Sequence, residues 1–173
     1  MDMLIRPVRV EDAAALHEIQ LQPAVLPYIL PLPSLRVAQL EARLRELERD
    51  MHFFVAEVEG RVAGYAGLKR LGGRQAHGGH IFLAVDAGRH GQGIGTALVQ
   101  KLLDLADGWL MLERVELSVL ETNPRAQRLY ERLGFQVEGR KLGSVVSQGA
   151  YVDEILMARL RPGGLLAGRK AQA

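Results

Sequence analysis

The fold is decided by the stretch Val85-Asp86-Ala87-Gly88-Arg89-His90-Gly91-Gln92-Gly93-Ile94-Gly95-Thr96-Ala97. It follows the continuous apolar run 81–85, which is typical of a central strand buried on both faces. Glycines let the backbone turn sharply and approach a ligand, and the first amides of a helix have no partner within it. The stretch therefore predicts a site where main-chain amides hold a phosphate group at the start of a helix. The expected helix carries one apolar stripe: Ile94, Leu98, Leu102, Leu105 and Trp109.

Two common nucleotide motifs do not fit this loop. The dinucleotide fingerprint G-x-G-x-x-G requires a glycine at position 96 or 98, where Thr96 and Leu98 stand. The P-loop requires Gly-Lys-Ser/Thr, and the loop contains no lysine. On the loop alone, one alternative stays open: the glycines only close a tight turn between a strand and a helix.

The segments on either side of the loop alternate between strand and helix patterns. No internal repeat or linker interrupts them, so we predict a single domain at 1–161 followed by a glycine-rich basic tail at 162–173. In chain order we expect a strand at 3–8, a helix from Glu11, an irregular proline-rich segment at 22–33, a helix capped by Ser34 that buries Val37, Leu40, Leu44, Leu47 and Met51, a hairpin at 52–68 turning at Glu59-Gly60, strands at 81–85 and 115–120, a helix at 124–133 closed by Gly134, and strands at 135–141 and 150–160.

Composition narrows the class of protein. The chain has 173 residues, 48% of them apolar, which is enough for a self-sufficient core. It has no cysteine, which excludes disulfide scaffolds, thiolate metal sites and a cysteine nucleophile. Nothing after Met1 resembles a secretory signal, and no apolar run approaches about 18 residues, the length of a membrane-spanning helix. We therefore expect a soluble, cytoplasmic protein with no membrane partner.

The small basic excess belongs to the last thirteen residues, 161–173. The chain has 22 basic and 20 acidic residues. Without Arg161, Arg169 and Lys170, the remaining 19 basic residues are balanced by 20 acidic ones. We therefore expect no nucleic-acid partner, and we interpret the tail as a solvated segment rather than a phosphate-binding arm.

Two blocks of the sequence resemble one known family. His90-Gly91-Gln92-Gly93-Ile94-Gly95 resembles the acetyl-CoA pyrophosphate motif R/Q-x-x-G-x-G/A of the GCN5-related N-acetyltransferase (GNAT) superfamily. Residues 117–135 resemble the strand, Asn-x-x-Ala-x-x-x-Tyr helix and Gly-Phe pair of the same superfamily. Together the blocks cover roughly residues 80–140. The one departure is His90, which stands at the motif's first position in place of Arg or Gln.

The resemblance implies an α/β fold, with a central mixed sheet of about seven strands flanked by about four helices. It implies direct transfer of acetyl from acetyl-CoA to the primary amine of a small molecule, without a metal, and it is compatible with a homodimer. An amino acid is the first candidate acceptor. A protein N-terminus or an antibiotic amine is the alternative, as is a non-catalytic CoA-binding module. The narrower likeness to bacterial amino-acid and ribosomal-protein acetyltransferases lies in four stretches: 22–23, 107–110, 137–139 and 151–159.

The resemblance also implies which residues contact acetyl-CoA. Backbone groups of Leu83, Ala84 and Val85 would lie along the pantetheine arm, and the Val85 amide could polarise the thioester carbonyl. Asn123, Arg128 and Tyr130 would complete the cofactor site from the second block. The pyrophosphate would be held by the loop residues His90, Gly91, Gln92, Gly93, Ile94, Gly95 and Thr96.

Tyr130 is the expected general acid, because the phenol can return a proton to the departing thiolate. The alternative is a core aromatic residue with a satisfied hydroxyl. The base is less defined: His80 is the first candidate because imidazole titrates in the required range, His77 is the second, and water is the third. Tyr28, in the proline-rich segment, is the expected acceptor-binding residue, although a packing role explains it equally well.

Overall fold

The computed structural model describes residues 2–170. Its seven strands form one sheet in the order β1-β2-β3-β4-β5-β7-β6, with both parallel and antiparallel pairs. The expected mixed sheet of about seven strands with about four helices is thereby confirmed. The strands are β1 (Met3–Pro7), β2 (Met51–Val58), β3 (Arg61–Arg70), β4 (Gly78–Val85), β5 (Arg114–Leu120), β6 (Gln136–Ser147) and β7 (Ala150–Leu160). The helices are α1 (Ala13–Gln20), α2 (Val37–Arg45), α3 (Ile94–Gly108) and α4 (Pro124–Arg132).

The chain divides into two compact units, and each is made of two separate stretches of sequence. Unit 1 comprises Met1–Leu68 and Phe82–Leu102. Unit 2 comprises Lys69–Ile81 and Leu103–Ala173. Strands β3 and β4 and helix α3 contribute residues to both units.

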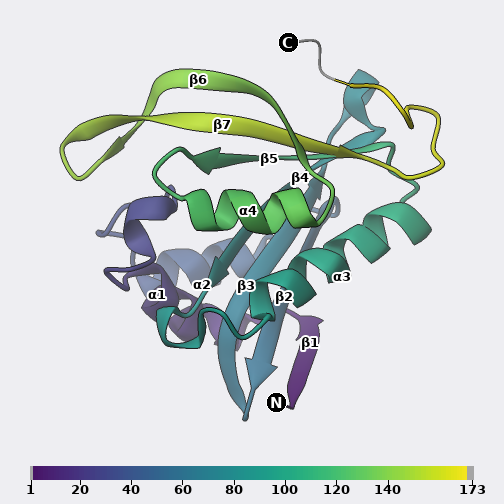
Figure 1. The fold of residues 1–173 in the computed structure, drawn as a ribbon. Coiled ribbons are helices and arrows are strands. Elements are labelled where there is room, and N and C mark those ends of the chain that lie inside the picture. Colours follow the sequence, from purple (N-terminus) through teal and green to yellow (C-terminus); the bar gives the residue numbers. More distant parts are fainter. Residues whose placement is uncertain (1, 171–173) are drawn as a thin grey trace. The chain divides into compact units, whose positions relative to one another are not determined.

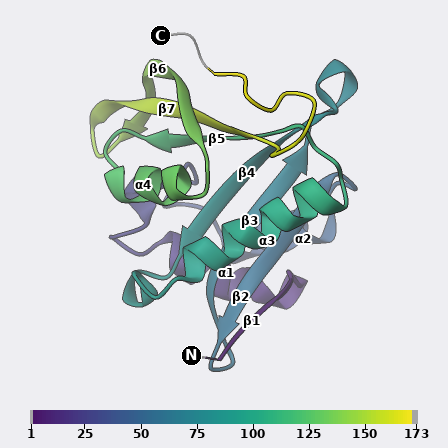
Figure 2. The ribbon, with the colours of Figure 1, turned by 45° about the vertical axis from the view of Figure 1, so that its right-hand side comes forward.

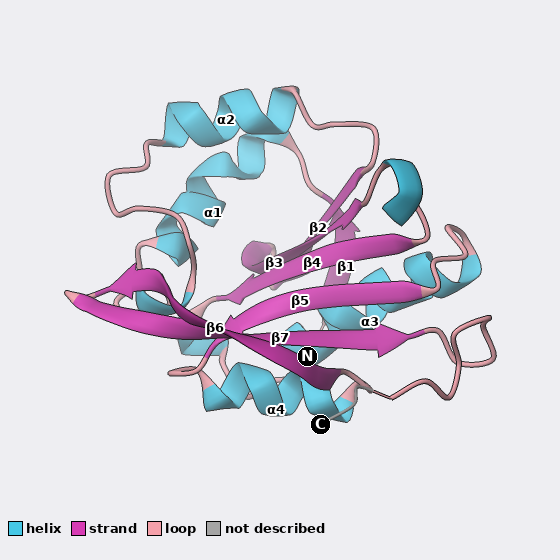
Figure 3. Cartoon of the chain, turned by 90° about the horizontal axis from the view of Figure 1, so that it is seen from above, coloured by secondary structure: helices cyan, strands magenta, loops and turns pink. Residues whose placement is uncertain are grey.

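Unit 1 contains the N-terminal strand and the expected hairpin. Strand β1 pairs antiparallel with β2, from Met3 opposite Val58 to Pro7 opposite Phe54 (Figure 2). Helices α1 and α2 lie side by side in this unit (Figure 3). The turn between β2 and β3 has positive φ at Glu59 and Gly60, 53° and 75°, which is the backbone of a two-residue hairpin turn. The core includes three aromatic rings with centroids 5.3 to 6.4 Å apart: Phe53, Tyr65 and Phe82.

The predicted second helix is shorter than expected. Its N-cap is Arg36 rather than Ser34, because the Arg36 amide donates to Gln39 Oε1 at 2.9 Å. Ser34 instead lies in a turn that ends where the Leu35 amide bonds to the Leu32 carbonyl. The helix ends at Arg45, and its buried residues are Leu40 and Leu44. Two residues expected on its buried face lie outside it: Leu47 in the following loop and Met51 at the start of β2.

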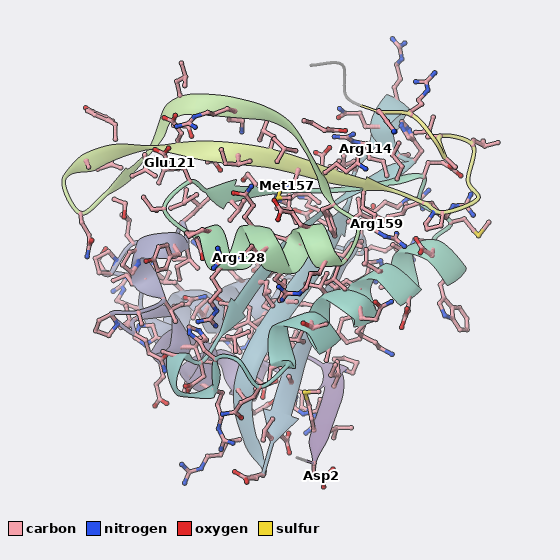
Figure 4. All side chains as sticks on the ribbon, viewed as in Figure 1. Asp2, Arg114, Glu121, Arg128, Met157 and Arg159 are labelled. Atoms are coloured by element: carbon pink, nitrogen blue, oxygen red, sulfur yellow. The ribbon has the colours of Figure 1, made fainter. Side chains whose placement is uncertain are left out.

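Unit 2 is built on three antiparallel strands. Strand β7 pairs with β5 and with β6, and β4 joins β5 in parallel at residues 78–80. Figure 1 shows α4 lying along β7. Arg159 of β7, labelled in Figure 4, forms two hydrogen bonds with Asp107 near the end of α3, at 2.9 and 2.8 Å. This bidentate pair fixes the end of the helix to the strand.

The end of α3 corrects one prediction. Trp109, expected on the buried stripe, lies beyond the helix and is 84% exposed. Met111 has φ of +52°, so the chain turns back, and the Leu112 amide bonds to the Ala106 carbonyl. Leu112, 1% exposed, is the residue that this turn buries. Helical spacing could not locate the turn, because it depends on this backbone reversal.

The start of the predicted tail is attached to unit 2. The Arg161 guanidinium bonds to the buried Glu113 carboxylate, and the amides of Leu165 and Leu166 also approach that carboxylate. Arg161 is the main cause that holds the pKa of Glu113 below its usual value. Part of the predicted tail, residues 171–173, lies outside the described residues.

Candidate active site

The glycine-rich loop lies in unit 1 between β4 and α3. Gly91 and Gly93 have φ of +79° and +83°, a region that other residues rarely adopt. The first bond of α3 runs from the Ala97 amide to the Gly93 carbonyl at 3.0 Å. The amides of residues 94–96 precede that bond and have no acceptor one turn earlier in the helix. Gly91, Gln92, Gly93 and Thr96 are exposed, so this helix start is open to a ligand. Such an arrangement can bind an anion through main-chain donors.

His90 closes the loop onto the strand that precedes it. Its Nε2 lies 2.9 Å from the Val85 carbonyl oxygen. Because a carbonyl can only accept, Nε2 must carry the hydrogen in this contact. The residue that departs from the family motif therefore contacts the end of β4 through its side chain.

Two further residues shape the loop entry, Asp86 and Gln22, and neither was a predicted site residue. The Asp86 carboxylate accepts from the Gly88 amide at 2.7 Å. The Gln22 side chain accepts from the Ala87 amide at 2.7 Å and donates to Asp86 at 3.2 Å. An Asp two residues before Gly is a recognisable turn signal, so Asp86 could have been predicted. Gln22 lies 64 positions earlier, and no local pattern indicates this contact.

The three pantetheine candidates end β4. Leu83, Ala84 and Val85 belong to unit 1, where Ala84 is buried and the other two are half-buried. The Asp86 amide that follows bonds to the Ala63 carbonyl of β3 at 2.9 Å, which fixes the end of the strand. Tyr28 also belongs to unit 1, in the 3-10 turn η2 (Leu26–Tyr28), and it is 41% exposed.

Helix α4, in unit 2, begins as the sequence predicts. Asn123 is its N-cap, and its Oδ1 accepts from the Ala126 amide at 3.1 Å. Pro124 follows at the first helical position, where its missing amide hydrogen costs nothing. Arg128, the third candidate of this block, is exposed on the same helix (Figure 4).

Tyr130 is the buried residue of α4. It is 6% exposed, and its ring meets the Phe135 ring edge-on at a centroid distance of 5.7 Å. Burial raises the pKa of its phenol, so the hydroxyl stays protonated across the ordinary pH range. Burial is the sole cause of this shift, and within the described residues no hydrogen bond to the hydroxyl contributes to it. It is therefore an available proton donor.

His80 lies among charged groups of three strands of unit 2. It stands opposite Glu116 of β5, and the charges that act on its ring are Glu116, Glu154 of β7 and Lys141 of β6. Burial dominates and lowers the pKa of His80, although the two carboxylates oppose this effect. The imidazole is therefore neutral at pH 7, as a general base must be.

Glu154 is the most buried acid of this group and was not found by sequence reasoning. It is 8% exposed and accepts from the hydroxyls of Ser118 at 2.6 Å and Ser144 at 2.9 Å. The Ser118 hydroxyl is the main cause that lowers the pKa of Glu154. The carboxylate is therefore charged at neutral pH. Alternation along β5 places Glu116 and Ser118 on one face, but only the pairing of β5 with β7 brings Glu154 beside them.

His77, the second base candidate, has a main-chain role. It is exposed in the turn before β4, and its carbonyl accepts from the amides of Glu113 and Arg114 at 2.8 and 3.3 Å. The site candidates thus fall into two groups. Tyr28, Leu83, Ala84, Val85 and the loop 90–96 belong to unit 1, whereas His77, His80, Asn123, Arg128 and Tyr130 belong to unit 2.

Neither a metal-binding cluster nor a membrane-spanning helix is found within residues 2–170. No three His, Asp or Glu side chains there are grouped as a metal ion would require. In the same part of the chain, no helix has the length and apolar character needed to cross a membrane.

Comparison with known proteins identifies similar sequences. The model of the acetyltransferase (GNAT) family matches residues 14–135. The L-amino acid N-acetyltransferase AaaT of Escherichia coli (strain K12) is 28% identical over 161 residues, which cover 92% of this chain and 99% of that protein. The N-alpha-acetyltransferase RimI of Mycobacterium tuberculosis (strain ATCC 25618 / H37Rv) is 32% identical over 147 residues, which cover 75% of this chain and 90% of that protein.

The fold is also found among solved structures. Spermidine N-acetyltransferase from Vibrio cholerae, solved in complex with CoA and spermine, superimposes with a TM-score of 0.83. The match covers 92% of this chain and 95% of that one, at 22% sequence identity. At that identity, the likeness shows a shared fold.

Proposed function

The chain belongs to the acetyltransferase (GNAT) family, and from this premise we propose that it transfers acetyl directly from acetyl-CoA to the primary amine of a small molecule, an amino acid first. The observation that carries the proposal is Tyr130: a buried phenol ring on an Asn-capped helix, whose hydroxyl has no hydrogen-bond partner within its own unit. A buried hydroxyl without a partner in its own unit still has a hydrogen bond to offer, and bound acetyl-CoA is the ligand we propose for it.

The loop would hold the pyrophosphate of the cosubstrate. Amides at the start of α3 that have no acceptor within the helix, together with two glycines at positive φ, fit a doubly charged anion without a lysine. Leu83, Ala84 and Val85 would pair through their backbone with the amides of the pantetheine arm, as an added strand does. Asn123 and Arg128 would add contacts from α4. Acetyl-CoA supplies the activated thioester.

In the proposed reaction, His80, the Val85 amide and Tyr130 each have one role. His80, neutral because it is buried, would take the proton from the acceptor ammonium, with His77 or water as the alternatives. The Val85 amide would stabilise the oxyanion that develops on the thioester carbonyl. Tyr130 would give its proton to the departing thiolate. No cysteine is available for a covalent enzyme intermediate, which agrees with direct transfer.

A polyamine is the second candidate acceptor, and one observation favours it. Glu116 and Glu154 put two carboxylates near His80, and Glu154 is charged at neutral pH. Negative charge beside the base would attract an acceptor with more than one ammonium group. Tyr28 would line the acceptor side in either case. We propose that the enzyme acts in the cytoplasm and that a homodimer is its assembly.

The acceptor is tested by release of free thiol from acetyl-CoA. The panel would contain amino acids, polyamines, aminoglycosides and N-terminal peptides at equal concentrations. Under the proposal, amino acids give the highest kcat/KM. A higher value for polyamines would select the second candidate, and one for peptides or aminoglycosides would select the remaining alternatives.

Binding of the cosubstrate is measured separately. Saturating CoA should raise the Tm, because a ligand at about 100 times its Kd stabilises the folded state by about 2.7 kcal/mol. Stabilisation by CoA without turnover of any acceptor would indicate a non-catalytic CoA-binding module. No stabilisation would contradict the cosubstrate itself.

Changing His80 to Ala tests the base. Since the pKa of His80 lies below its usual value of about 6.5, activity of the unmodified enzyme should rise with pH to a plateau at or below neutrality. His80→Ala should lose this ascending limb and about 100-fold in kcat. His77→Ala is the matched control, and it should keep the ascending limb of the pH profile and the original kcat. If His77→Ala alone abolishes the limb, the base is His77; if both variants retain it, the base is water.

A further inference from the structure

Gln22 makes a two-point contact with the entry of the glycine-rich loop. Its Oε1 accepts from the Ala87 amide at 2.7 Å, and its Nε2 donates to Asp86 Oδ2 at 3.2 Å. The other oxygen of Asp86 accepts from the Gly88 amide at 2.7 Å. Gln22 and Asp86 together therefore satisfy two consecutive main-chain amides of the 3-10 turn η4 (Ala87–Arg89). All these residues belong to unit 1.

Gln22 is itself held firmly, and it starts the proline-rich segment. Its carbonyl accepts from the amides of Val25 and Leu26 at 2.8 and 2.9 Å, which defines the first turn of residues 23–33. Val25 is buried in the core of unit 1. One residue connects the two segments: its main chain shapes the proline-rich segment, and its side chain shapes the loop.

We propose that Gln22 is a positioning residue that couples the acceptor segment, residues 23–33, to the pyrophosphate loop. The inference rests on the proposed function, because it takes the loop as the site of CoA and the segment as part of the acceptor site. Gln22 touches no reacting atom. A pyrophosphate that binds the loop would restrict the motion of Ala87 and Asp86. Through their hydrogen bonds to Gln22, it would also restrict the motion of the segment that carries Tyr28.

The hydrogen-bond pattern allows an exchange of donor and acceptor. In Gln22→Glu, the new carboxylate still accepts from the Ala87 amide but faces the Asp86 carboxylate. In Asp86→Asn, an NH2 group replaces one of the two oxygens that act as acceptors at position 86. Either the bond from Gln22 or the bond from the Gly88 amide is therefore lost. In the double variant Gln22→Glu/Asp86→Asn, the carboxylate at position 22 accepts both from the Ala87 amide and from the new side-chain amide at position 86. The remaining oxygen at position 86 can still accept from the Gly88 amide. The double variant restores the pattern with the roles reversed.

Steady-state kinetics on the four proteins test the coupling. Each single variant should raise the KM for acetyl-CoA and for the acceptor roughly five- to tenfold, the effect of about one lost hydrogen bond, while kcat at saturation changes less than about twofold. The double variant should return both KM values to within about twofold of the original, which is strong non-additivity. Two single effects that simply add in the double variant would overturn the proposal.

A second readout separates coupling from general stability. Chymotrypsin can cut the chain after the exposed Tyr28, and saturating CoA should slow this cleavage at least about fivefold in the original protein and in the double variant. Protection should be lost in Gln22→Ala, even where its urea midpoint is unchanged. Equal protection in Gln22→Ala would refute the coupling while leaving the proposed function intact. If CoA fails to raise the Tm of the original protein, the proposed function fails and the inference falls with it.

Discussion

Changing Tyr130 to Phe is expected to lower kcat about 100-fold, the contribution of a well-placed general acid. The substitution removes one oxygen and keeps the ring that packs on Phe135, so unit 2 should retain its structure. The affinity for CoA should change less than about twofold, because a hydroxyl that acts on the leaving thiolate acts only during reaction. Steady-state kinetics and calorimetric titration with CoA measure the two quantities.

The matched control is Tyr151→Phe. Tyr151 is 80% exposed on β7, so its hydroxyl can be lost with no effect on kcat. Burial raises the pKa of Tyr130, so its phenol should stay protonated below about pH 10. Ionisation of Tyr130 should therefore cause no fall in activity of the original enzyme in that pH range. An unchanged kcat in Tyr130→Phe would remove the residue as the acid and leave it as a core aromatic.

Changing Gly93 to Val is expected to raise the KM for acetyl-CoA about 10- to 100-fold, through loss of one or more main-chain hydrogen bonds to a charged phosphate. A β-branched residue cannot keep φ near +83°, so the loop must change its backbone and move the amides of residues 94–96. No atom lies within 4 Å of the position of a Cβ at Gly93, so the effect comes from the backbone alone.

Gly60→Val provides the control for backbone strain. Gly60 has φ of +75° in the hairpin turn, also with nothing within 4 Å of its Cβ position. Both variants should lose roughly 1–2 kcal/mol of stability, the usual cost of a left-handed residue with a side chain. Only Gly93→Val should lose affinity for CoA. Equal KM values in the two variants would contradict a pyrophosphate site in this loop.

The elements that the sequence predicts well are those with local causes. Strand β7 runs over Ala150–Leu160 as expected, because its continuous apolar run 155–158 is typical of a buried strand. Asn123 caps α4 because its side chain reaches an amide only three residues away. Glycines 91 and 93 adopt positive φ because the turn between β4 and α3 is tight.

The elements that it predicts poorly depend on distant or backbone-specific contacts. Ser34 is a good capping residue, yet Arg36 begins α2 because Gln39 reaches back to its amide. Trp109 follows the helical spacing of α3, yet the helix ends at Gly108 and Trp109 is exposed, while Met111 takes positive φ in the turn that follows. In each case, a backbone conformation that the local sequence does not predict prevails over a local preference, for capping at Ser34 and for helical spacing at Trp109.

The candidate site divides in the same way. The loop and Tyr130 could be found because their residues are close in sequence and resemble a family motif. Gln22 and Glu154 could not, since each acquires its partners only when segments far apart in the chain meet. Single-sequence reasoning therefore finds the groups that bind the common cosubstrate more readily than those that define the acceptor.

The two units are completed at different times during translation. Every residue of unit 1 has been made once Leu102 is added. Unit 2 also begins early, at Lys69, but the cation for its buried Glu113 is Arg161, and the amides that approach that carboxylate come later still. Since chains fold in the order in which they emerge, unit 1 can form on the ribosome while unit 2 waits for these residues. Neutralisation of the Glu113 carboxylate is thus a late step that completes the folding of unit 2.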